Sequence, residues 1–165
     1  MLTQRTIDIA NDRDFVLSLR SLSTFENDSP AWRPTSLATY RARWNDGAAD
    51  EFMDRLTRSL EDERTIAEIW EEDGRPVAFI WVGFTSPAAY GVVVAEVLDI
   101  EVVPSHQRLG IGTLLLQHAE TLARERGAVI LRSETPVKNE ASQVLYKKLG
   151  FSPDRVRLEK PLAPV

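Results

Sequence analysis

The stretch Gln107-Arg108-Leu109-Gly110-Ile111-Gly112-Thr113 is a glycine-rich loop between an apolar segment, 92–103, and an amphipathic helical segment. The first turn of such a helix leaves backbone N–H groups without internal partners, and the helix dipole adds partial positive charge at the same end. Two glycines remove the β-carbons that would keep a ligand away from these donors. The stretch therefore predicts an anion site suited to a pyrophosphate.

The rest of the chain predicts alternating strands and helices around this loop. Strands are expected at 6–10, 66–71, 77–84, 92–103 and 129–133, followed by closing strands that begin at 151, the last of them near 156–160. The first helix is expected to begin at a cap, Asn11 or Asp12, and to end near 23. Further helices are expected at 36–44, 48–60, 110–127 and 139–149. Asp73-Gly74 between two apolar runs predicts a hairpin, because glycine tolerates the positive φ of such turns. Residues 1–165 are thus expected to form a single α/β domain, with a strongly twisted mixed sheet flanked by helices.

Composition narrows the functional class. The 165 residues carry a net charge of −5 and no run of Lys and Arg, which argues against a nucleic-acid partner. There are no cysteines, and the only histidines are His106 and His118, so no metal site is expected. No apolar run approaches membrane-spanning length and the N-terminus lacks a signal-peptide pattern, so we expect a cytoplasmic protein without a membrane partner.

Three classes of phosphate-binding loop compete for the glycine-rich stretch. A dinucleotide-binding fold expects a third glycine where Leu115 stands, and a P-loop expects a Gly-Lys-Ser/Thr sequence that is absent. The third class is the Gln/Arg-x-x-Gly-x-Gly/Ala loop of the GNAT acetyltransferases, which 107–112 matches at every defined position. Segments 100–104, 131–134, 139–141 and 145–151 resemble the strands and helix of that family in order and spacing. Over about 97–151 the chain therefore resembles the GNAT superfamily.

The resemblance implies a GNAT fold that binds acyl-CoA at a splay between the central strands, with acetyl-CoA as co-substrate and no metal. It implies that the backbone at 100–103 pairs with the pantetheine arm, that amides from 108 to 113 hold the pyrophosphate, and that the asparagine of 139–141 contacts the cofactor. Gln107 replaces the more usual arginine. The expected cofactor-binding residues are Ile100, Val102, Val103, Gln107, Arg108, Leu109, Gly110, Ile111, Gly112, Thr113 and Asn139.

Acyl transfer to an amine needs a base for the ammonium, a donor for the oxyanion, and an acid for the departing thiolate. The backbone N–H near Val102 is a candidate for the oxyanion. Tyr146 is the candidate acid, because the tyrosine of the matching family segment lies near the cofactor sulfur, and a phenol can protonate a thiolate. The alternative for Tyr146 is a packing role with a solvated hydroxyl.

Several carboxylates compete for the role of base. Glu134 ranks first, because related protein N-terminal acetyltransferases keep a catalytic glutamate there, and Glu101 ranks second as a mid-strand carboxylate beside the expected thioester. Glu96 and Asp99 are further candidates on the same strand. For each of them the alternative is a solvated strand edge or an ion pair.

The sequence therefore predicts an N-acetyltransferase that moves an acetyl group from acetyl-CoA to a primary amine by direct attack on the thioester. The alternative is a catalytically silent acyl-CoA-binding or sensing module of the same fold. The acceptor, a longer acyl donor and a homodimer all stay open. His118 is expected in the core and His106 in solvent, and the residues that could line the acceptor pocket are Trp32, Tyr40, Trp44, Phe52 and Trp81.

Overall fold

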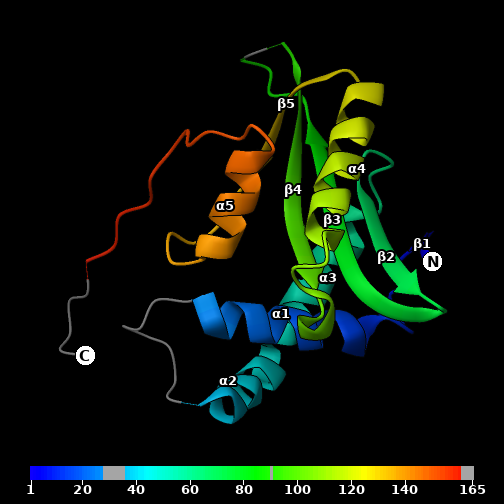
Figure 1. Ribbon diagram of the computed structural model, residues 1–165, viewed down its shortest axis with the longest axis vertical. Coiled ribbons are helices and arrows are strands. Elements are labelled where there is room, and N and C mark those ends of the chain that lie inside the picture. Colours follow the sequence, from blue (N-terminus) through cyan, green and yellow to red (C-terminus); the bar gives the residue numbers. More distant parts are fainter. Residues whose placement is uncertain (28–35, 90, 161–165) are drawn as a thin grey trace.

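The computed structural model describes residues 1–27, 36–89 and 91–160, and its centre is a five-stranded mixed sheet flanked by helices (Figure 1). The strands are β1 (Leu2–Thr6), β2 (Ile66–Glu72), β3 (Arg75–Thr85), β4 (Val93–Val102) and β5 (Ala128–Ser133). The helices are α1 (Arg13–Asn27), α2 (Leu37–Arg43), α3 (Ala49–Ser59), α4 (Ile111–Glu125) and α5 (Glu140–Lys148), with a π turn at Trp44–Ala48 and a 3₁₀ turn at Pro104–His106. The sheet order is β1-β2-β3-β4-β5, antiparallel throughout except for the parallel pair β4 and β5. The expected mixed sheet is confirmed.

Local backbone preferences explain two of the turns. Asp73 and Gly74 both have positive φ, 51° and 75°, which is the geometry of a type I′ hairpin between β2 and β3. Gly47 has φ of 107° and interrupts the helical run between α2 and α3. The hairpin and the break at 45–47 are thus found where the sequence predicts them.

Each face of the sheet is covered by different helices. Figure 1 shows α4 running along the strands while α1 crosses their lower end at a steep angle. On one face, Ile80 and Val82 of β3 pack with Leu115 and Leu116 of α4, all almost fully buried. On the other face, Phe79 and Trp81 pack with residues of α1 and α3. Strand β3 therefore lies at the centre of two cores, as its nearly continuous apolar sequence requires.

A β-bulge in β4 reverses which side chains face α4. Trp81 pairs with Asp99 but its neighbour Val82 pairs with Val97, so Leu98 is the extra residue. Before the bulge Ala95 and Val97 belong to the core under α4, and after it Ile100 and Val102 do. Because side chains alternate along a strand, this one-residue insertion turns Asp99 and Glu101 to the face covered by α1.

Two expected strand positions are wrong. The first strand is Leu2–Thr6 rather than 6–10, because the Asp8 carboxylate accepts hydrogen bonds from the amides of Ala10 and Asn11 and so turns the chain into α1. No strand forms in 151–160, although Val156 and Leu158 alternate with charged residues as in a strand. This segment leads away from the helices and sheet (Figure 1), and without a neighbouring strand its backbone has no ladder to join.

Within the described ranges, none of the helices is long and apolar enough to cross a membrane. Trp32, one of the residues expected near the acceptor, lies outside the described residues.

Candidate active site at the splayed end of β4

The two parallel strands separate at the centre of the sheet. β4 pairs with β5 only from Val93 to Val97, because β5 ends at Ser133 while β4 continues to Val102. Beyond that point the amide of Val103 donates to Val77 of β3 at 2.9 Å. Strand alternation then directs the N–H of Val102 to the opposite side, which β5 has left open. A strand-like ligand arm can pair with this edge, so the backbone at 100–103 fits the role that the resemblance implies.

The glycine-rich loop connects this edge to α4. Arg108 and Gly110 both have positive φ, 64° and 90°, and Gly110 is the residue that precedes α4. The first helical hydrogen bond runs from Leu114 N–H to the Gly110 carbonyl at 3.1 Å, which leaves the amides of 111–113 without intrahelical partners. No atom lies within 4 Å of a β-carbon built on Gly110. Gly110 is therefore required by its backbone conformation, and the free amides fit a phosphate group.

The second glycine of the loop has a different neighbour. A β-carbon on Gly112 would lie 3.1 Å from Cδ2 of Leu145 in α5. Gly112 therefore lets α4 and α5 approach each other, a packing role that the sequence did not predict. Gln107 also has a local role, because its side-chain amide donates to the Val102 carbonyl at 3.2 Å and fixes the loop against β4.

Asp99 and Glu101 form a pair of carboxyl groups on the α1 side of the splay. Their side chains are 3% and 13% exposed. The Asp99 Oδ1 accepts from the Ile100 amide at 3.0 Å and from Arg20 Nη1 at 3.2 Å, and Arg20 Nη1 lies 3.7 Å from Glu101 Oε1. Asp99 Oδ2 is buried and has no hydrogen-bond partner among the described residues.

Burial and like charge make this pair basic. The pKa of Glu101 is raised to about 8, first by burial and then by the nearby Asp99 charge, while a hydrogen bond from Ser23 and the Arg20 charge oppose both effects. Burial also raises the pKa of Asp99 above its ordinary value, against the charges of Arg20 and Arg55. A carboxylate with a pKa near 8 can accept a proton from an ammonium group at mildly alkaline pH.

Tyr146 reaches the same opening from α5. Its hydroxyl shares a hydrogen bond of 2.6 Å with Ser133 Oγ at the end of β5. Burial raises the pKa of Tyr146, and the charges of Asp99 and Glu101 act in the same direction, which places the phenol near both carboxyl groups. The phenol therefore stays protonated over a wide pH range and is available as a proton donor.

The other predicted residues lie outside this pair. Glu134 is exposed directly after β5, and Glu96 lies where β4 is paired on both sides, opposite Gly83 and Arg132. Asn139 caps α5, with its Oδ1 accepting from the Ser142 amide at 3.1 Å.

The two histidines have carboxylate partners. His118 is partly buried and lies 2.8 Å from Glu68 Oε2, in agreement with a core role. His106 contacts Glu72 at 3.1 Å and Ser105 at 2.8 Å, so the expectation of a simply solvated ring is wrong.

Aromatic rings form a continuous series beside the carboxyl pair. The series consists of Tyr40, Trp44, Phe52 and Trp81. The distances between successive ring centroids are 6.3, 6.2 and 6.0 Å. Trp81 is the cross-strand partner of Asp99. Four of the five aromatic residues suggested by the sequence thus form one series, and Trp81 at its end is the one that lies beside Asp99.

Arg20 and Ser133 are the residues at this site that sequence reasoning missed. Arg20 precedes Asp99 of β4 by 79 residues, and Ser133 is one polar residue at a strand end. Arg20 lies outside the segments that carry the family resemblance, whereas Ser133 lies within one of them, 131–134, but has no distinctive local pattern. Only the tertiary contacts identify these two residues, Arg20 with Asp99 and Ser133 with Tyr146.

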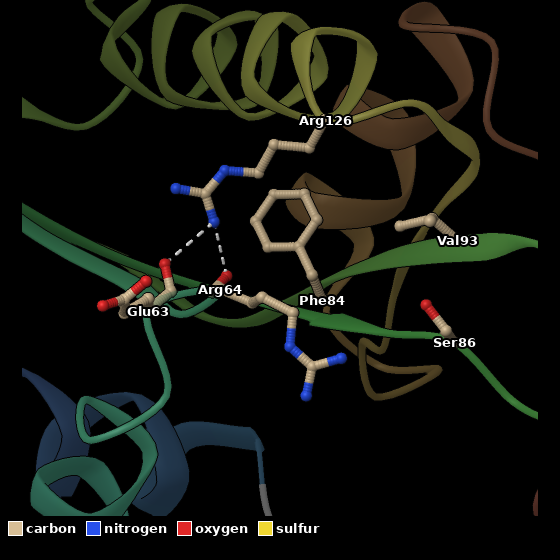
Figure 2. Close-up of a pocket in the computed structure, with 6 residues that line it drawn as sticks. All are labelled: Glu63, Arg64, Phe84, Ser86, Val93 and Arg126. Atoms are coloured by element: carbon tan, nitrogen blue, oxygen red, sulfur yellow. Dashed lines mark hydrogen bonds between the residues drawn. The ribbon is translucent and has the colours of Figure 1, made fainter.

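A shallow pocket of about 360 Å³ lies at the opposite end of β4. Figure 2 shows the Arg126 side chain beside the Phe84 ring, with its guanidinium bonded to the backbone carbonyls of Glu63 and Arg64. The Arg126 Cζ is 4.6 Å from the ring centroid. These contacts fix the end of α4 to the loop before β2, so we interpret this pocket as structural.

The splayed parallel strands and the glycine-rich start of α4 are two of the features that the sequence resemblance leads us to expect. The model of the acetyltransferase (GNAT) family matches residues 22–151, and the chain belongs to this family.

Several proteins that resemble the chain in fold or in sequence are named acetyltransferases. A GCN5-related N-acetyltransferase from Ralstonia eutropha JMP134 superposes with a TM-score of 0.73 at 26% identity, over 99% of this chain and 100% of that one. Streptothricin acetyltransferase from Streptomyces lavendulae is 44% identical over 54 residues, 33% of this chain and 29% of that protein. The ribosomal protein bS18-alanine N-acetyltransferase of Salmonella typhimurium is 38% identical over 63 residues, 38% of this chain and 43% of that protein. The chain thus matches less than half the length of these two curated relatives.

Proposed function

We propose that this protein transfers an acetyl group from acetyl-CoA to a primary amine. The observation that carries the proposal is the convergence, where β4 and β5 separate, of the Asp99 and Glu101 carboxyls from the α1 face and the Tyr146 phenol from α5. The Glu101 carboxylate can accept the proton of an ammonium group, and the Tyr146 phenol can donate a proton to the leaving thiolate. Acyl transfer from a thioester to an amine needs both steps.

Acetyl-CoA, the acetyl donor, would be held mainly by backbone groups of the chain. The unpaired edge of β4 at 100–103 fits the pantetheine arm, and the free amides of 111–113 with the Gly110 turn fit the pyrophosphate. Asn139 and Arg108 are the side chains proposed to contact the cofactor. Acetyl-CoA supplies the activated acyl group when it is bound.

The chain's own groups then move two protons. Glu101 takes a proton from the acceptor's ammonium, and the free amine nitrogen forms a C–N bond to the carbonyl carbon as the C–S bond breaks. The Val102 N–H stabilises the negative charge that develops on the carbonyl oxygen. Tyr146 gives its proton to the departing thiolate, and the phenolate regains a proton from the attacking nitrogen, which loses its second proton as it becomes an amide. We place Glu101 ahead of Glu134 as the base, because Glu101 is buried at the opening and Glu134 is exposed beyond it.

The acceptor class can be tested directly. We would mix the full chain with acetyl-CoA and a panel of lysine-bearing peptides, peptides with free N-termini, spermidine and kanamycin, and measure free thiol release at pH 8.5. Faster release with at least one amine than with buffer alone supports the proposal. Tight binding of CoA in titration calorimetry with no amine-dependent release would contradict it and favour the silent sensing module.

The same proposal takes residues 1–165 as one domain that acts in the cytoplasm without nucleic acid, membrane or metal. These parts rest on the sequence composition. Light scattering at several protein concentrations distinguishes a monomer from a homodimer.

A further inference from the structure

Arg20 is the residue that connects α1 with both carboxyl groups of the site. Its Nη1 lies 3.2 Å from Asp99 Oδ1 and 3.7 Å from Glu101 Oε1, and its Cζ lies 5.8 Å from the centroid of the Phe52 ring. The side chain is 32% exposed, so it extends from the surface into the carboxyl pair. Its planar guanidinium can contact an aromatic face and a carboxylate at the same time.

The pair needs a cation at this place. Asp99 and Glu101 lie two residues apart on the same face of β4, and both are largely removed from water. Two carboxylates in such surroundings do not both ionise unless a positive charge offsets their repulsion. The hydrogen bonds at Asp99 all go to Oδ1, and its buried Oδ2 has no partner in the part of the chain that the structure describes.

We propose that Arg20 is a positioning residue for acyl transfer, which balances the charge of Asp99 and so keeps the Glu101 carboxylate available to take the acceptor's proton. The inference rests on the proposed function, with Glu101 as the base. Arg20 itself touches no reacting atom in this role. It acts through the two carboxyl groups that it joins.

The other groups that face Glu101 do not replace Arg20. From α1, Ser23 donates a hydrogen bond that lowers the pKa of Glu101, and the Glu26 charge raises it. From β4, the Asp99 charge raises it, and Arg55 of α3 acts on Asp99 rather than on Glu101. Tyr146 of α5 is neutral near pH 8 because burial raises its own pKa. Arg20 is therefore the cation of this set that acts on both carboxyl groups.

The decisive experiment measures Glu101 itself, without an acceptor. In full-length protein labelled with ¹³C at the glutamate carboxyl, NMR titration follows Glu101, and its resonance is assigned by its absence in Glu101→Gln. We expect Arg20→Gln to raise the titration midpoint of Glu101 by about one pH unit, since a lost neighbouring charge typically shifts a pKa by this amount. Arg20→Lys, which keeps the charge, should restore more than half of the shift.

Arg13→Gln is the matched control. Arg13 lies on the same helix and pairs with Asp50 at 2.5 Å, away from the carboxyl pair. It should leave the Glu101 midpoint unchanged. If Arg20→Gln does not fold, Arg20→Met is the second neutral variant, because its thioether chain can keep the packing against Phe52. A Glu101 midpoint in the folded neutral variant that equals the parent's overturns the proposal.

A kinetic measurement separates this proposal from the proposed function. With an amine that the parent accepts, Arg20→Gln should lower kcat/KM about tenfold at pH 7 and approach the parent rate above pH 9, with an unchanged KM for acetyl-CoA. An equal loss at every pH indicates a structural role only and contradicts the proposal. If the parent releases no thiol with any amine, the proposed function fails, whereas the NMR titration still decides whether Arg20 controls Glu101.

Discussion

Two buried aspartates, Asp12 before α1 and Asp99 in β4, each accept a hydrogen bond from an arginine of another element. Asp12, with its side chain 5% exposed, accepts from Arg5 Nη1 and Nη2, both at 2.7 Å, and from the Asp8 amide at 2.7 Å. The hydrogen bonds from Arg5 hold the pKa of Asp12 below its ordinary value. Asp12 is thus an anion with both oxygens satisfied, and it connects β1 to the start of α1.

Asp99 has the same kind of partner but fewer donors. One of its oxygens has no donor among the described residues, and burial raises its pKa. The contrast shows that burial alone does not decide how an acidic group behaves, because the number of donors on each oxygen decides whether the charged form is favoured. A carboxylate whose two oxygens both accept hydrogen bonds stabilises the fold. A carboxyl pair with an oxygen that lacks a donor retains the capacity to exchange a proton.

The largest expected effect is a loss of turnover when Glu101, the neighbour of Asp99, is changed. Glu101→Gln removes the proposed base, so we expect turnover at pH 8 to fall by roughly 10²–10⁴-fold, the range for losing general base catalysis. CoA affinity should stay unchanged. Thiol-release kinetics measure the first quantity and titration calorimetry the second. The control is Glu134→Gln at the exposed position after β5, and a larger loss in this variant than in Glu101→Gln would return the role of base to Glu134.

Tyr146→Phe tests the acid that faces the same pair. Removing one hydroxyl leaves the ring in place against Phe151, at 5.1 Å between centroids, so the fold should not change. We expect turnover to fall by about 10²-fold, because the thiolate then departs without a positioned acid. Single-turnover rates at saturating acetyl-CoA measure this. A rate within threefold of the parent would show that the hydroxyl serves only its bond to Ser133.

At Asp12 we expect a substitution to lower stability rather than turnover. Asp12→Asn replaces an anion that accepts three hydrogen bonds, so the free energy of unfolding should fall by about 2–3 kcal/mol while turnover stays near the parent value. Asp99→Asn should lower turnover and change stability by less than about 1 kcal/mol, because burial opposes the charged form and Oδ2 has no donor among the described residues to lose. Urea denaturation compares the two. Equal stability losses would remove the distinction between the two sites.

The last prediction concerns the pH dependence of stability. The folded-state pKa of Glu101, about 8, lies above its ordinary value of 4.5, so its stabilising contribution is complete below about pH 4.5 and is lost as pH rises through 8. Glutamine cannot ionise. Glu101→Gln should therefore gain roughly 4 kcal/mol relative to the parent between pH 5 and pH 9, because most of the difference between a pKa of 4.5 and one of about 8 is expressed over this range. Thermal unfolding at both pH values measures this gain, and a constant difference between the two proteins would contradict the high pKa.

Local features of the fold could be predicted because they depend on residues close together in sequence. Gly74 and Gly110 occupy backbone conformations that few other residues adopt, so the hairpin and the loop before α4 follow from the residues themselves. The apolar stripe of α4 likewise repeats at the helical period, and Ile111, Leu115, Ala119 and Ala123 of it are buried as expected, whereas Leu114 is exposed. The first strand and the segment 151–160 were not predicted correctly, because hydrophobic alternation identifies a strand only where a neighbour is available.

The sequence by itself determined the family, the glycine-rich loop before α4 and the presence of acidic residues on β4. It did not determine which of these residues lie together as a buried pair. That depends on the bulge at Leu98, which directs Asp99 and Glu101 to the α1 face, and on Arg20, which reaches them across the sheet. The physical reason is that a carboxyl group's proton affinity is set by the water it loses and the charges it meets, and both follow from contacts between residues far apart in the chain.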